Sequence, residues 1–227
     1  YVKGQVDISA SDGEDAIQKA ISANPSGAYI KLAQNVYQGG IQTEAGSNIT
    51  IDLNGHELKC VPPFVGSDSS YSNGLRFMKG SKVLIKNGTV KTSSPELAIL
   101  IQNFADELIL DNVTLSGKLS TQYILSNNFG NVVMKNGTTV KASGGHVAFD
   151  AHYGLSPEYD DGVTVNIADD TVKIIGLVEY PKKEGKSDED FLSRTHIYIP
   201  VGYDLTAPEG YKFQLTEDKT RQELVKA

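Results

Sequence analysis

The sequence contains one neighbourhood whose side chains could catalyse a reaction. In the segment AFDAHYG, Asp150 and His152 are two residues apart, so they share a face if the segment is a strand, and His146 lies just before them. With Arg76 from an earlier part of the chain, these residues could form a cluster of carboxylate, imidazole and guanidinium groups. Such groups transfer protons to and from substrates, and they are the catalytic candidates of this sequence.

Acidic residues in the same region could bind calcium. Asp150, Asp160 and Asp161 are the candidate metal ligands, because calcium takes oxygen ligands and can acidify a sugar proton. The alternative is structural: His146 and His152 occupy corners of the fold, and residues 160–162 form an exposed turn. We favour this alternative, so no cofactor is expected, and calcium is expected only if the chain is an enzyme.

Aromatic residues outside the apolar pattern suggest a binding surface instead, because exposed rings stack on sugars and anchor protein contacts. The long excursion 61–74 is the best candidate for a functional loop, since insertions in repeat proteins collect on the binding face. The candidate ligand-binding residues are Phe64, Tyr71, Tyr153 and Tyr159. Phe104 and Phe129 also lie beside turns, where they could instead fill corners of the fold.

A repeated strand-and-turn unit must position these residues. The unit appears four times, as IDLNGHEL (51–58), LIKNGTV (84–90), ILDNVTL (109–115) and VMKNGTTV (133–140). Its Asn residues are 33, 25 and 24 positions apart. Such periods are typical of proteins in which each repeat buries its apolar face by stacking on its neighbours. Further short apolar segments between the units favour a coil of parallel strands over a sandwich.

The Asn of each unit is expected to stabilise a bend. Asn87, Asn112 and Asn136 are in phase with the preceding core residues, whereas Asn54 is one residue out of phase. We therefore predict that the first three form a structural ladder that faces the core. Asn also tolerates the left-handed backbone conformation that a tight bend needs.

A short helix is predicted before the first strand. Ser11 and Glu14 match a capping box, an apolar stripe covers residues 16–21, and Asn24-Pro25 ends the pattern. This helix, at about 11–23, should cover the open end of the stacked strands.

The segment 13–37 followed by NITIDLNGHEL (48–58) resembles the start of the pectate-lyase-like superfamily. The resemblance covers about residues 10–177 and implies an all-β fold, a right-handed single-stranded parallel β-helix with an N-terminal capping helix. It implies no particular activity, because this scaffold carries lyases, hydrolases, tailspikes and non-catalytic surface modules. Of the hydrolase motifs only an Asp-Asp pair occurs, at 160–161, and the chain has no Trp for the lyase signature. In the segment NITIDLNGHEL and in its short repeats, the chain is most similar to repeat-bearing bacterial cell-surface proteins.

The last fifty residues differ in composition. Residues 178–227 hold 18 charged residues, against 31 in the preceding 177. We therefore predict two parts, a β-helix over 1–177 that ends near Gly176 and an appendage over 178–227. The appendage should contain a solvated loop at 181–190 and then antiparallel strands that pack on the last coil.

Charge and cysteine content limit the classes of partner and the kinds of cysteine chemistry that the chain could have. A net charge of −7 disfavours nucleic acid as a partner, and no long apolar run predicts membrane insertion in this segment. The lone Cys60 excludes an internal disulfide and is expected to be a buried, inert thiol. The chain starts at Tyr1 without a leader, so we expect a segment of a longer exported protein, outside the cell or on its surface.

We therefore expect a non-catalytic extracellular surface module that binds carbohydrate or adheres to a glycan or cell-surface partner. The first alternative is a polysaccharide lyase or glycoside hydrolase of the same superfamily. The second alternative is a structural spacer that displays other domains.

Overall fold

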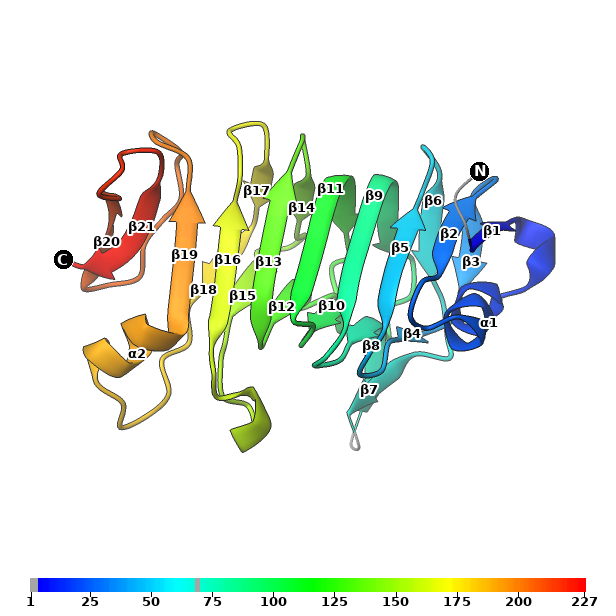
Figure 1. Cartoon of the computed structure of the whole chain (residues 1–227), viewed down its shortest axis with the longest axis horizontal. Coiled ribbons are helices and arrows are strands. Elements are labelled where there is room, and N and C mark those ends of the chain that lie inside the picture. Colours follow the sequence, from blue (N-terminus) through cyan, green and yellow to red (C-terminus); the bar gives the residue numbers. More distant parts are fainter. Residues whose placement is uncertain (1–3, 68–69) are drawn as a thin grey trace.

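The computed structural model describes residues 4–67 and 70–227, and short parallel strands make up most of it (Figure 1). The chain supplies strands in turn to three stacks, and the paired strands within each stack are parallel. This arrangement confirms the prediction of an all-β chain with parallel sheets. Two short α-helices accompany the strands, α1 (Ala16–Ala23) and α2 (Asp188–Arg194).

The first stack faces the viewer in Figure 1. It consists of β1 (Gln5–Ile8), β2 (Tyr29–Leu32), β5 (Asn48–Asp52), the first parts of β9 (Lys82–Thr92) and β11 (Glu107–Ser116), β13 (Gly130–Lys135), β16 (Val163–Ile167) and β19 (Thr195–Ile199). The second stack consists of β3 (Val36–Gln38), β6 (Glu57–Cys60), the second parts of β9 and β11, β14 (Thr139–Lys141) and β17 (Lys173–Ile175). Because β9 and β11 run through both stacks, the two stacks belong to one sheet.

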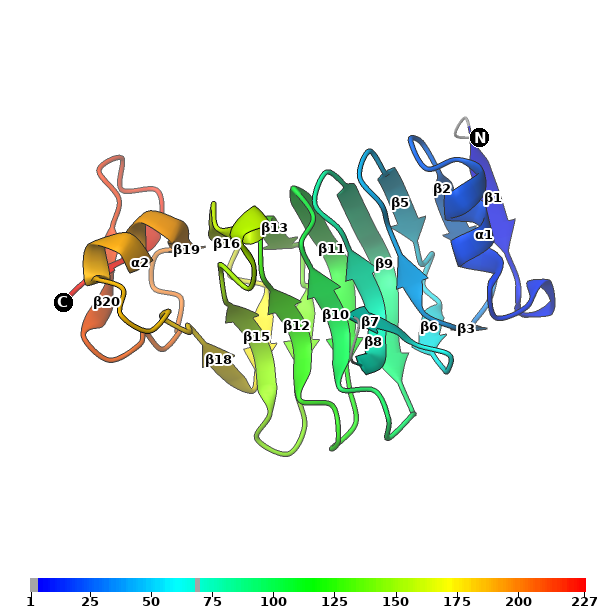
Figure 2. The same ribbon diagram turned by 90° about the horizontal axis from the view of Figure 1, so that it is seen from below.

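The third stack lies along a different side of the molecule, which faces the viewer in Figure 2. It consists of β4 (Ile41–Gln42), β8 (Ser70–Phe77), β10 (Ile99–Asn103), β12 (Tyr123–Asn127), β15 (Val147–Ala151) and β18 (Leu177–Glu179). The short strand β7 (Val65–Ser67) pairs with β8 in an antiparallel hairpin.

The core lies between the stacks and is built from aligned rows of apolar side chains. One row runs through the first stack at a single register, and each of its members is at most 1% exposed: Ile30, Ile51, Ile85, Leu110, Met134 and Ile167. Burying each such side chain stabilises the fold by roughly 1.5–3 kcal/mol. Cys60 is also fully buried, and burial raises the pKa of its thiol to about 12, so this thiol is unreactive as predicted.

The Asn of each repeat forms the corner between the first and second stacks. Asn54, Asn87, Asn112 and Asn136 have φ angles of 51°, 59°, 55° and 54°, which is the left-handed conformation expected from the sequence. The prediction that they face the core is wrong, because Asn112 and Asn136 are exposed and Asn87 is half-buried. A left-handed residue breaks the alternation of the strand, so the side chain leaves the phase of the core residues before it.

These corner side chains still bond along the stack. Asn112 donates to Oδ1 of Asn87 over 3.3 Å, whereas Asn136 donates to Oδ1 of Asp111 over 2.7 Å. Asn87 donates to Oδ1 of Asp52 over 3.3 Å. The corner is therefore a mixed ladder of amides and carboxylates on the surface.

The N-terminal end departs from the prediction in two ways. The α-helix begins at Ala16 rather than near residue 11, and its N-cap residue Asp15 makes no side-chain capping bond. A capping box forms earlier than predicted, at a short 3-10 helix (Ala10–Asp12), where the Asp12 carboxylate accepts the Ser9 backbone N–H over 2.6 Å. A strand that the sequence analysis missed, β1, extends the first stack beyond β2. The helix α1 packs beside β1 and β4, with its Ile17 N–H bonded to the Gln38 side chain (Figure 1). It thus lies at the end of the molecule where the second and third stacks begin.

At the other end the parallel pairing continues beyond the predicted limit near Gly176. Strand β18 pairs with β15 and β19 pairs with β16, both in parallel. The antiparallel hairpin of β20 (Tyr211–Leu215) and β21 (Gln222–Lys226) then extends the first stack through β19. Helix α2 begins inside the segment predicted to be a loop, with Ser187 as its N-cap.

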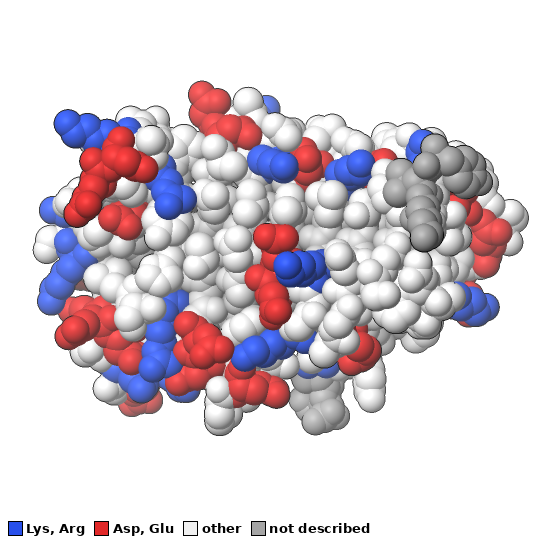
Figure 3. All heavy atoms as spheres, viewed as in Figure 1, with Lys and Arg blue, Asp and Glu red and all other residues white. Residues whose placement is uncertain are grey.

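Charged side chains follow the same registers on the outer surface. Along the edge of the first stack, Asp52, Lys86, Asp111 and Lys135 alternate in sign on neighbouring strands, and Figure 3 shows this alternation. Neither α-helix in the described residues is long and apolar enough to cross a membrane.

Candidate functional site

The outer face of the third stack carries an unbroken row of polar side chains, one from each of its six parallel strands. Register pairing aligns these residues on the strands of the third stack. Each is followed or preceded by residues that point into the core, so the row points outward. We call it the polar row: Gln42, Arg76, Gln102, Ser126, Asp150 and Glu179. It brings together two of the sequence candidates, Asp150 and Arg76, with four residues that the sequence analysis missed.

Asp150 is the least exposed acid of the row, at 3%. Its Oδ1 accepts the backbone N–H of Asn127 over 2.7 Å, and its Oδ2 accepts the hydroxyl of Ser126 over 3.1 Å. Burial dominates these two bonds and raises the pKa of Asp150 to about 7, with the charge of Glu179 on the neighbouring strand adding to the effect. Asp150 therefore changes charge near neutral pH, although its oxygens are already bonded and shielded from solvent.

Three further ionisable groups lie around Asp150. Tyr123 donates its hydroxyl to Glu179 over 3.2 Å, and burial together with Glu179 raises the pKa of Tyr123. Burial lowers the pKa of His152 below its usual range. His146 lines a hollow of about 260 Å³ with Tyr123 and Glu179. The sequence prediction thus placed Asp150, His146 and His152 in one region, but it missed Tyr123 and Glu179, which line the hollow there.

Arg76 does not join this cluster. It lies in the same row three strands away from Asp150, which is about 14 Å at the usual strand spacing. Its Nη1 donates to the carbonyl of Gly66 over 2.9 Å, and its guanidinium lies 5.7 Å from the Phe104 ring. The prediction that Arg76 joins a cluster with Asp150 and the histidines is therefore wrong.

Neighbouring amides connect the row. Asn73 donates to Gln102 over 2.7 Å, and Gln102 donates to Asn128 over 3.4 Å. Asn128 in turn donates to the backbone carbonyl of His152 over 3.2 Å. Asn73 and Asn128 are buried, at 4% and 1% exposed, so their bonds hold the half-buried Gln102 in a set direction, which favours recognition over proton transfer.

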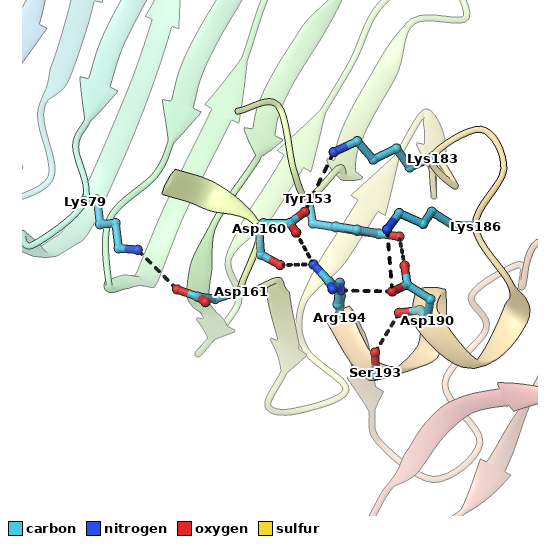
Figure 4. A network of polar contacts seen from close by, with 9 residues as sticks. All are labelled: Lys79, Tyr153, Asp160, Asp161, Lys183, Lys186, Asp190, Ser193 and Arg194. Carbon is cyan, nitrogen blue, oxygen red and sulfur yellow. Dashed lines mark hydrogen bonds and ion pairs between the residues drawn. The ribbon is translucent and has the colours of Figure 1, made fainter. Parts of the chain in front are cut away.

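Asp160 and Asp161, the predicted metal ligands, lie elsewhere and hold a loop in place (Figure 4). The guanidinium of Arg194 on α2 pairs with the Asp160 carboxylate and donates to the Asp160 backbone carbonyl over 2.7 Å. Lys79, from the turn after β8, pairs with Asp161 over 3.1 Å. These contacts fasten the loop 152–162 to two distant parts of the chain.

The three predicted metal ligands do not converge. Within residues 4–67 and 70–227 no group of three His, Cys, Asp or Glu side chains is placed to hold a metal ion. The ion pair with Arg194 keeps the pKa of Asp160 below its usual range, and Asp150 is held by its own hydrogen bonds. A calcium site formed by Asp150, Asp160 and Asp161 is therefore not supported.

Most of the predicted stacking residues are buried. Tyr153 is fully buried and donates to Asp190 over 3.0 Å, while Phe64 and Tyr159 are 7% and 8% exposed. Rings this deeply buried cannot stack on a sugar. Tyr71 is 74% exposed, and alternation along β8 places it on the same side as Asn73, beside the polar row.

A satellite cluster explains the remaining aromatic residues. The Tyr159 ring lies 4.3 Å from that of Phe104 and 6.0 Å from that of Phe129, and Met78 packs against them. Phe104 and Phe129 thus fill a corner of the fold, as the structural alternative predicted.

Comparison of the chain with protein-family models, curated protein sequences and solved structures finds no match.

One signal in the sequence could have found the polar row. In each segment that follows an Asn unit, a polar residue comes directly after an apolar one, as in Leu75-Arg76, Ile101-Gln102, Leu125-Ser126 and Phe149-Asp150. That position recurs at the repeat period, so it must fall on one line along the stack.

Proposed function

We propose that the chain is a right-handed parallel β-helix of the pectate-lyase-like kind and serves as a non-catalytic module that binds carbohydrate along the polar row. The fold proposal is supported by three stacks filled in a fixed order and by the left-handed Asn corner that recurs in four repeats. The expected place of such a module is outside the cell or on its surface.

The polar row is the observation that carries the binding proposal. Its six members lie on neighbouring strands, so it extends for about 24 Å at the usual spacing between strands. A linear oligosaccharide laid along the stack would meet the four half-buried members of the row, Gln42, Arg76, Gln102 and Glu179, while the buried Ser126 and Asp150 support the row from beneath. Planar amide, carboxylate and guanidinium groups offer the paired donors and acceptors that adjacent sugar hydroxyls require.

Exposed Tyr71 beside Asn73 gives this row an aromatic surface near its N-terminal end. Stacking of a sugar on one ring, together with several hydrogen bonds, is the usual composition of a small-ligand site, in which few polar groups fix the orientation.

Calorimetric titration of the chain with a panel of neutral and acidic oligosaccharides tests this function. At least one linear oligosaccharide should bind, and Gln102→Ala and Tyr71→Ala should each weaken its binding about fivefold to tenfold, because each removes roughly 1 kcal/mol of interaction. Lys118→Ala, in an exposed turn away from the row, is the matched control. Absence of binding across the panel, or equal affinity in all three variants, would contradict the proposal.

A second candidate is a glycoside hydrolase or polysaccharide lyase, and the raised pKa of Asp150 beside Glu179 favours it. An acid that is protonated near pH 7 next to a second carboxylate, here the half-buried Glu179, is the pairing that glycosidic cleavage uses. The burial of Asp150 argues against direct contact with a substrate. Assays for reducing ends and unsaturated products should therefore detect no cleavage, and turnover that disappears in Glu179→Gln and Asp150→Asn would establish the enzyme instead.

A further inference from the structure

The outer face of the first stack carries a pattern of charge and apolar side chains that is complementary to itself. On β9, the residues that point away from the core are Lys82, Leu84 and Lys86, and on β11 they are Glu107, Ile109 and Asp111. Register pairing sets each residue of β9 beside its counterpart on β11. On this outer surface, two basic residues and one apolar residue of β9 therefore lie beside two acidic residues and one apolar residue of β11.

The same relation extends to the next strands on either side. Asp52 on β5 and Lys135 on β13 continue the charged row. Val133 on β13 continues the apolar row, which ends on the other side at the polar Thr50 of β5. Reflection across the line between β9 and β11 therefore pairs unlike charges again. Figure 3 shows the alternating charges along one edge, with uncharged surface below them.

From this pattern we infer that the outer face of the first stack is a homodimer interface, on which a second copy of this chain packs face to face about a two-fold axis parallel to the strands. Such an axis, placed between β9 and β11, puts β9 of each copy opposite β11 of the other at the same height. Lys82 would then face Glu107 of the second copy, Lys86 would face Asp111, and Leu84 would pack on Ile109. Parallel alignment of two sheets in this way is a common packing mode.

The partly exposed apolar row supplies the reason for association. Leu84, Ile109 and Val133 are each partly exposed on the flat face of a sheet, between two rows of charged or polar residues. An apolar strip with a polar rim is the usual anatomy of a protein interface, and unlike charges across it fix the orientation.

The size of the face predicts a weak dimer. Six strands, from β2 to β16, cover about 29 Å along the stack, and five residues per strand cover about 16 Å, which gives about 460 Å² in projection. Stable interfaces bury about 800 Å² on each partner. The association should therefore depend on concentration and weaken as salt is added. It does not depend on the proposed carbohydrate site, because the polar row lies on a different stack.

Sedimentation equilibrium of the whole chain at rising concentration, in low and high salt, tests whether the dimer forms. Charge reversals then test its geometry. Lys82→Glu and Glu107→Lys should each weaken association about tenfold, because the two-fold axis turns two attractive contacts into two repulsive ones. The double variant should regain the original affinity.

Mixing the two single variants gives the sharpest result. The carboxylate introduced at 82 in one copy faces the lysine introduced at 107 in the other, while the native pair is intact on the other side of the axis, so the mixture should associate as tightly as the original chain. Lys118→Glu is the matched control, and melting curves establish that each variant is folded. A chain that stays monomeric at the highest concentration, or single variants that do not recover on mixing, would overturn the proposal.

Discussion

Asp150 is an ionisable residue whose hydrogen bonds serve the structure of the stack. Its carboxyl group links β15 to β12, because it accepts hydrogen bonds from the Asn127 backbone N–H and from the Ser126 hydroxyl. The site thereby loses hydration, and the pKa rises to about 7 because burial disfavours the charged form more than two neutral donors stabilise it.

This raised pKa predicts how stability varies with pH. In the unfolded chain Asp150 loses its proton near its ordinary pKa of 3.8, whereas the folded chain retains it up to about 7. The contribution of Asp150 is therefore fully present below pH 4 and is lost as the pH rises to 7. Asp150→Asn should remove this loss. The free energy of unfolding of the variant minus that of the original chain should therefore be roughly 1–3 kcal/mol larger at pH 8 than at pH 4.

Urea unfolding of both chains at pH 4 and pH 8 measures that difference. Because His152 is present in both, its own titration cancels in the comparison. Equal pH dependence in the two chains would mean that the Asp150 carboxylate is well solvated.

The corner Asn residues predict a substitution pattern set by backbone conformation. Asn112 has a φ of 55° and an exposed side chain. Asn112→Gly should change stability by less than about 0.5 kcal/mol, whereas Asn112→Ala should cost about 1 kcal/mol and Asn112→Val more, since left-handed backbone penalises a Cβ and penalises a branched one most. Thermal melting of the three variants measures the order, and equal losses for Gly and Ala would show that the side-chain bond to Asn87 dominates instead.

At the scale of elements, the loop 152–162 depends on α2 for its position. Arg194 binds the loop through both the carboxylate and the carbonyl of Asp160, and it also pairs with Asp190 over 3.3 Å within its own helix (Figure 4). Arg194→Ala should leave the Asp160 carbonyl without this donor and the Asp160 carboxylate with only the longer contact to Lys183, at 3.8 Å, and should cost roughly 1–3 kcal/mol. Hydrogen exchange in 152–162 should become faster, since the loop loses its strongest tie. Lys186→Ala, whose ammonium lies 4.0 Å from Asp190, is the control and should change little; equal exchange in both variants would show that the Tyr159 cluster alone holds the loop.

The sequence predicted some elements well because local pattern determines them. The alternation around Asn87, Asn112 and Asn136 was enough to predict parallel repeats and left-handed corners. It could not predict the facing of these Asn side chains, because a single left-handed residue changes the phase of all that follows. The line of the polar row can be found from its recurrence at the repeat period, but the burial of Asp150 and Ser126 cannot, because it arises only when strands 24 residues apart become neighbours.

At the scale of the whole molecule, composition was misleading about where the stack ends. Charge density rises after residue 177, yet Phe191 and Ile197 from the charged part are buried in the same core as the repeats. Charged residues in this part occupy loops and outer faces, while the alternating residues of β19 cover the last apolar row. The charge density of a segment therefore indicates how many of its residues lie on the surface. Whether the segment belongs to the core depends on the apolar residues that its strands point inward.

Truncation at the compositional boundary tests this view. A chain that ends at residue 177 loses β19 and Phe191 and exposes Val163, Val165 and Ile167 on an unpaired strand edge. It should melt at a markedly lower temperature or aggregate, because an uncovered apolar edge recruits other chains. Ile197→Ala in the full chain is the companion variant, since it removes one buried side chain from the same contact and should cost roughly 2–5 kcal/mol without removing the strand. A monomeric 1–177 fragment with the melting temperature of the full chain would show that residues 178–227 form a separate appendage.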